Sequence, residues 1–164
     1  MKTYMKFLSI LPVAVMFIAT TFASSALASP PPLTINGLIE ASEVHVHQPG
    51  ILGILDVDGG GHASVLGRYA MHEVATVVMV DNSSGSAVGT ADIIAANGDH
   101  IFTNVDEHVT WNQDITAGTI VETQTITGGT GRFAGATGTI AINRVLDLAT
   151  MLSIGTITGT ITLP

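Results

Sequence analysis

The segment Gly128-Gly129-Thr130-Gly131-Arg132-Phe133-Ala134-Gly135-Ala136-Thr137-Gly138 decides the fold. It contains five glycines in eleven residues. Because glycine alone takes up positive φ without steric cost, the segment predicts a tightly turned connection. The runs on both sides of it, residues 119–127 and 137–146, alternate polar with β-branched residues, which is typical of β-strands. The segment therefore predicts two antiparallel strands joined by an irregular loop that Phe133 anchors in the core.

Similar alternating runs cover most of the chain, and turn residues separate them. Asn97-Gly98, for example, lies between two such runs and is a strong hairpin signal. The segment Asp58-Gly59-Gly60-Gly61 is expected to be a loop. About eight strands at regular spacing predict an all-β, eight-stranded antiparallel β-barrel, with a two-sheet sandwich as the alternative. The predicted strands are residues 33–40, 43–47, 51–57, 69–80, 87–96, 100–110, 119–127, 137–146 and 153–163.

The first 28 residues have the pattern of a signal peptide. A basic start precedes an apolar run over residues 7–22, and Ala26-Leu27-Ala28 forms a small-residue cleavage site. A spanning helix needs roughly 20 apolar residues, so the run predicts no stable membrane insertion after cleavage. Residues 29–32, Ser-Pro-Pro-Pro, predict a stiff linker, and residues 33–164 a single domain. The expected location is secreted or periplasmic.

The balance of charge excludes several classes of partner. Lys2 and Lys6 would leave with the signal peptide, so thirteen acids would face three arginines, a formal net charge of −10. Such a chain repels phosphate backbones, and nucleic-acid binding is therefore not expected. The chain has no cysteine, which excludes disulfides, thiol catalysis and thiolate metal sites.

Three charged residues fall in the apolar phase of their predicted strands: Glu107, Glu122 and Arg144. Buried charges are costly unless they are paired, so Arg144 is expected to pair with Glu107 or Glu122 in a partly polar interior. These three residues are the candidate catalytic group. A buried carboxylate would act as a general acid while the guanidinium holds an anionic oxygen. The alternative is a structural ion pair that fixes the register of the strands.

A second candidate site is the pattern Glu43-x-His45-x-His47. Alternate residues of a strand lie about 6.5–7 Å apart and point the same way, so two imidazoles in this pattern can chelate one metal ion. Imidazole suits Zn or Cu. The alternative is a solvated polar face, with Val44 and Val46 turned to the core. No cofactor is expected under that alternative.

The glycine segment also carries a family resemblance. Residues 126–138 resemble the hallmark segment of bacterial proteins with the allene oxide cyclase barrel-like fold, and plant dirigent proteins carry a similar segment. Residues 67–69, 95–99 and 122–125 resemble further pieces of those bacterial proteins, so that the match covers residues 60–164. The resemblance implies an eight-stranded, calycin-like barrel with a central cavity. It also implies a homo-oligomer, as in many plant members, but no particular reaction.

These features support three functional hypotheses. The first is an exported β-barrel that binds a small, mainly apolar molecule in its cavity, with Glu107, Glu122 and Arg144 as polar fixtures. The second is a cyclase or isomerase that uses a cavity carboxylate as acid or base. The third is a structural or interaction protein whose threonine-rich face meets a partner. The sequence leaves open whether the protein is an enzyme.

Overall fold

The computed structural model describes residues 30–48 and 51–164. The predicted signal peptide, residues 1–28, and the first linker residue lie outside the described residues. Within the described part of the chain, no helix is long and apolar enough to cross a membrane.

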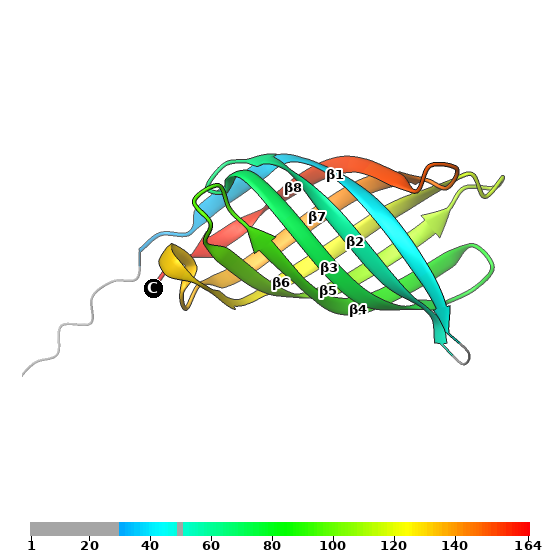
Figure 1. Ribbon diagram of the computed structural model, residues 1–164, viewed down its shortest axis with the longest axis horizontal. Helices are drawn as coiled ribbons and strands as arrows, with labels where there is room; N and C mark the ends of the chain where they lie inside the picture. The colour runs from blue at the N-terminus through cyan, green and yellow to red at the C-terminus, as the bar shows by residue number, and fades with distance from the viewer. Residues whose placement is uncertain (1–29, 49–50) are drawn as a thin grey trace, which may run out of the picture.

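The described residues form eight strands, each antiparallel to the next, and one short 3₁₀ helix, η1. The first strand also pairs with the last, which closes the sheet into a barrel (Figure 1). The predicted all-β, eight-stranded antiparallel barrel is therefore confirmed, and the sandwich alternative is wrong. The elements are β1 (Leu33–Gln48), β2 (Ile51–Ala63), β3 (Gly67–Met79), β4 (Ser84–Ile94), β5 (His100–Trp111), β6 (Ala117–Gly129), η1 (Gly131–Phe133), β7 (Thr137–Asp147) and β8 (Leu152–Thr162).

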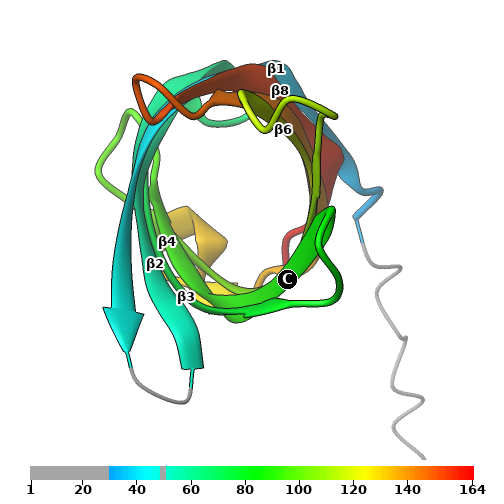
Figure 2. The same cartoon turned by 90° about the vertical axis from the view of Figure 1, so that its right-hand side faces the viewer.

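The two ends of the barrel differ. One end, here called the η1 end, carries η1, the turns at 64–66 and 95–99, and the C-terminus (Figure 1). The opposite end, here called the far end, carries the turns at 80–83, 112–116 and 148–151. Figure 2 looks along the barrel from the far end, with η1 visible behind the ring of strands.

Two segments differ from the sequence-based expectation. Residues 43–47 are not a separate strand but continue β1, and residues 58–61 are not a loop but part of β2. Gly59, Gly60 and Gly61 stay hydrogen-bonded within the sheet, and the neighbouring strand β1 runs very close to them. A Cβ added to Gly61 would lie 2.0 Å from the carbonyl oxygen of Leu38, and one added to Gly59 would lie 2.9 Å from Cβ of Ala41. The lack of side chains therefore allows tight pairing with β1 rather than breaking the strand.

Strict alternation sends one face of every strand into the barrel. In β8, Ile157 and Ile161 are buried while Thr156, Thr158 and Thr160 face solvent, as the sequence predicts. Branched aliphatic side chains from all sides of the barrel meet in one core. Its largest fully buried aliphatic members are Ile35, Ile39, Leu55, Leu66, Ile93, Ile101, Ile140 and Ile142.

The glycine segment closes the η1 end. Gly131 has a φ of 52°, and a Cβ there would lie 1.9 Å from Oδ1 of Asp99, so only glycine fits. The Asp99 carboxylate accepts a hydrogen bond of 3.0 Å from the backbone N–H of Arg132. This turn directs Phe133 into the core, where its side chain is fully buried. The predicted anchoring role of Phe133 is confirmed.

We expect Phe133→Ala to lower the free energy of unfolding by about 3–5 kcal/mol, because it removes a fully buried ring and leaves a cavity. Phe102→Ala is the matched control, since the Phe102 side chain is on the outer face and 41% exposed. Urea denaturation of both variants measures the difference. Equal losses of stability would contradict the anchoring role.

Candidate functional site

A charged cluster lies inside the barrel around the guanidinium of Arg144, which β7 directs inward. Its Nη2 donates hydrogen bonds to Oε2 of Glu107 at 2.7 Å and to Oε2 of Glu122 at 3.3 Å. Its Nη1 donates to Oε1 of Glu43 at 2.8 Å. All four residues are at most 3% exposed. The expected pairing of Arg144 is confirmed with both predicted carboxylates, and Glu43 is an additional partner.

The register of the sheet explains why the guanidinium is needed. Glu107 on β5 and Glu122 on β6 are direct cross-strand partners, and both point inward. Like charges in that arrangement repel each other. Arg144 on β7 reaches both carboxylates with one nitrogen atom. It therefore offsets a repulsion that the pairing of β5 with β6 creates.

Glu73 on β3 is a member of the cluster that sequence reasoning did not include. Its side chain is fully buried, and a carboxylate oxygen of it lies within 4.8 Å of carboxylate oxygens from both Glu107 and Glu122. Both of its oxygens lack a hydrogen-bond partner among the described residues. The sequence contains a signal for this position, because Glu73 lies two residues from both Met71 and Ala75 and so shares their inward face.

Neutral polar side chains extend the cluster toward the η1 end. Gln124 donates from Nε2 to Oε1 of Glu122 at 2.5 Å and accepts at Oε1 from the hydroxyl of Thr103 at 2.9 Å. Both residues are buried. The hydrogen bonds fix the orientation of the Gln124 amide and hold one oxygen of Glu122 in place.

The charged layer separates two apolar regions. On the η1 side lies the main core. On the far-end side lies a small cluster of Val109, Ile120 and Leu146, against which the partly buried Trp111 and Leu148 pack. On β5, β6 and β7 the charged residue is the inward position next to one of these three apolar residues. The layer is therefore shielded from solvent by side chains at both ends.

Burial raises the pKa values of the carboxyl groups. Desolvation, reinforced by the charges of Glu122 and Glu107, raises the pKa of Glu73 to about 9. Desolvation also raises the pKa of Glu107 to about 7, although the charge of Arg144 opposes the shift. Desolvation is also the main cause that raises the pKa of Glu122. The Glu73 carboxyl group is therefore protonated at neutral pH, and the cluster carries less negative charge than its acidic side chains would carry if all were ionised.

The predicted metal ligands of β1 occupy different environments. Glu43 is buried in the charged cluster, whereas Val44 is 59% exposed, so the alternative of a solvated Glu43 face opposite a buried Val44 is wrong. The cause is the continuity of β1, whose phase is set by Ile35 and Ile39. Nε2 of His45 lies 3.7 Å from Oε2 of Glu43, and the His45 side chain is 38% exposed. The side chain of His47 lies outside the described residues. Binding of Zn or Cu at Glu43, His45 and His47 stays a prediction.

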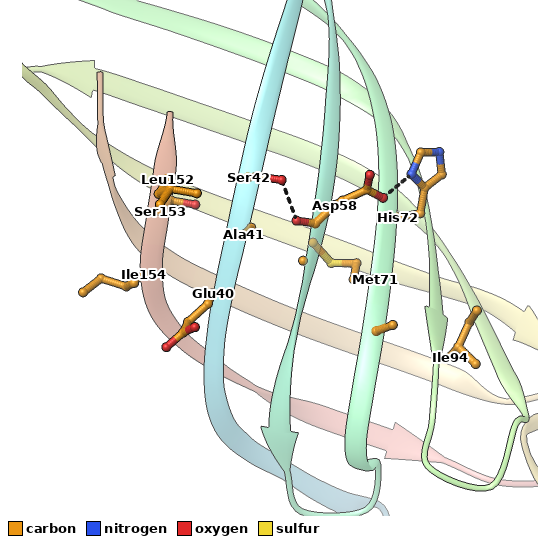
Figure 3. A pocket seen from close by; sticks show the side chains of 12 residues that line it. Glu40, Ala41, Ser42, Asp58, Met71, His72, Ile94, Leu152, Ser153 and Ile154 are labelled. Carbon is orange, nitrogen blue, oxygen red and sulfur yellow. Dashed lines mark hydrogen bonds and ion pairs between the residues drawn. The ribbon is translucent and has the colours of Figure 1, made fainter. Parts of the chain in front are cut away.

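A second polar group lies on the outside of the barrel, beside a groove of about 570 Å³ (Figure 3). Nδ1 of His72 is 2.9 Å from Oδ1 of Asp58 and 3.7 Å from Oδ1 of Asp56. The backbone of Gly59 and the small side chain of Ala70 line the groove. Leu152 and Ile154 of β8 also line it.

Comparisons with protein-family models, with curated proteins and with solved structures find no match to this chain. The resemblance to the allene oxide cyclase barrel-like proteins is therefore still a prediction, and the charged cluster must be interpreted from its own chemistry.

We expect Arg144→Met to lower the free energy of unfolding by about 3–5 kcal/mol, because it leaves buried carboxylates without their counter-charge. Arg132→Met is the control, since Arg132 is exposed on η1. Chemical denaturation at neutral pH measures both. A loss no larger than that of the control would show that the cluster does not depend on Arg144.

We expect Asp58→Asn to lower the pKa of His72. The hydrogen bond that the Asp58 carboxylate accepts from the His72 ring is the main cause that raises this pKa, with smaller contributions from the charges of Asp56 and Asp92. An NMR titration of the His72 ring measures the shift. Asp106→Asn, an exposed acid on β5, is the control. An unchanged His72 pKa in Asp58→Asn would contradict this assignment.

Proposed function

We propose that this protein is an exported β-barrel that binds a small, mainly apolar molecule. The molecule would enter at the far end, and its polar group would contact the charged cluster. The proposal rests mainly on one observation: Arg144 and the glutamates that contact it are enclosed between two apolar regions. Buried ion pairs contribute little to stability compared with apolar packing of the same volume. A polar layer in this position is therefore better explained by recognition than by stability.

The difference between the ends of the barrel supports the far end as the entrance. At the η1 end, Phe133 is fully buried and closes the barrel. At the far end, the small apolar cluster of Val109, Ile120 and Leu146 is covered by Trp111 and Leu148, both only partly buried. Side chains of this kind can move aside for an apolar molecule at less cost than a buried ring. The ligand would then place its polar group toward Arg144 or the carboxylates.

Kinship with the allene oxide cyclase barrel-like proteins is part of this proposal. The closed, eight-stranded antiparallel sheet is the architecture that the resemblance implies. Such an architecture hosts unrelated activities, so the ligand must follow from the site and not from the fold. Export rests on the signal-peptide pattern of residues 1–28 and would leave Ser29 as the first residue of the mature chain.

A neutral apolar dye, N-phenyl-1-naphthylamine, tests the proposed entrance. Trp111 is the only tryptophan of the chain, so its fluorescence reports on the far end. We expect the dye to bind and to quench Trp111. We expect Val109→Phe, which fills the far end, to weaken dye binding at least about tenfold, a change of about 1.4 kcal/mol.

Val121→Phe is the matched control, because Val121 belongs to the neighbouring strand but lies on the outer face, 51% exposed. The dye should bind this variant as it binds the unchanged protein. Absence of dye binding, or equal weakening in both variants, would refute the far-end site. Native mass spectrometry of the exported protein then gives the mass of any molecule that copurifies and the number of chains in the assembly.

Acid–base catalysis by a cyclase or isomerase is the second candidate function. The observation in its favour is the 2.7 Å contact between Oε2 of Glu107 and the Arg144 guanidinium. A carboxyl group can transfer a proton there while the guanidinium stabilises an oxyanion. Glu107→Gln separates the two functions, because it preserves the shape of the side chain. An enzyme would lose turnover in this variant, whereas a binding protein has no turnover to lose.

A further inference from the structure

We propose that Glu73, Glu107 and Glu122 form a binding site for a calcium ion inside the barrel. This site differs from the predicted Zn or Cu site of β1 in its residues and in its chemistry. It rests on other observations than the apolar ligand proposed above, and the two proposals share only the carboxylates of Glu107 and Glu122.

The geometry of the three carboxylates suits the ion. One oxygen from each residue lies within 4.8 Å of the others. Calcium binds oxygen at about 2.3–2.6 Å, so two ligands on opposite sides of the ion are separated by up to about 5 Å. The three residues come from β3, β5 and β6 and converge on one volume. Carboxylate oxygens gathered in this way can share one calcium ion.

Glu73 supplies an independent indication of a ligand. Its side chain is completely buried, it points into the cluster, and neither oxygen has a hydrogen-bond partner among the described residues. A buried polar group without a partner costs about 1–3 kcal/mol, and more when it is charged. A bound cation would satisfy both oxygens at once, since calcium accepts bidentate carboxylates.

The charges of the layer also call for a cation. Among the described residues, four buried acidic side chains, those of Glu43, Glu73, Glu107 and Glu122, surround one guanidinium, so that with all four ionised the layer has an excess of three negative charges. Arg144 makes its two shortest contacts with Glu43 and Glu107, at 2.8 and 2.7 Å. The negative charges of Glu73 and Glu122 are therefore the least compensated by the guanidinium. A doubly charged ion between them offsets most of the excess.

The type of ligand selects the class of metal. All three donors are carboxylate oxygens, which suit hard cations such as calcium, magnesium and manganese rather than zinc or copper. Magnesium keeps several of its waters and demands a strict octahedron, whereas calcium tolerates irregular carboxylate cages. A water-poor site between two apolar regions therefore favours calcium.

Native mass spectrometry and thermal unfolding test the site. The protein is stripped with EGTA and titrated with calcium chloride at mildly alkaline pH, because metal ligands must be deprotonated. We expect one calcium ion per chain and a rise of the unfolding midpoint with calcium concentration. Parallel titrations with magnesium and with zinc should give a smaller rise.

Glu73→Gln should abolish both effects, and Glu122→Gln provides the same test should the first variant fold poorly. Asp58→Asn is the matched control, because Asp58 belongs to the outer Asp56–Asp58–His72 group, which also brings three potential ligands together. This control should bind calcium like the unchanged protein. The proposal is overturned if the unchanged protein binds no calcium, if binding persists in Glu73→Gln and Glu122→Gln, or if it disappears in Asp58→Asn.

Discussion

The guanidinium of Arg144, enclosed by carboxylates, is the interaction on which the interior of this barrel depends. It contacts Glu43, Glu107 and Glu122, and so connects β1, β5, β6 and β7 across the lumen. Without it, the cross-strand pairing of Glu107 with Glu122 would place two like charges opposite each other in a dry environment. The positions of the other charged groups follow from this one.

An interior of this kind limits what the barrel can do. Apolar side chains fill the η1 end, and the charged layer follows at about the level where the small far-end cluster begins. A molecule bound inside the barrel must therefore make apolar contacts at the far end and compensate the charges of the layer around Arg144. The proposed apolar ligand and the proposed calcium ion use these two parts of the same interior, and each can be tested without the other.

The outer surface has a different character. Threonines cover much of β8, and the His72 group lies beside a groove that Ala70, Leu152 and Ile154 line. Sequence patterns did not predict this groove, since residues 58–61 were expected to be a loop. The glycines are accommodated within β2 because β1 approaches them too closely for any side chain, as the contact between Gly61 and Leu38 illustrates.

The sequence by itself determined most of the strands and the placement of Glu107, Glu122 and Arg144 in the interior, because alternation along a strand is a local property. It did not determine the inward position of Glu43 or the continuation of β2 through residues 58–61. The closure of β1 onto β8 and the convergence of the cluster were decided by the tertiary structure alone. Glu43 and Arg144 are 101 residues apart in the chain and meet only because the barrel closes. Glu73 joins them through the register of β3 with its neighbours, which no single strand encodes.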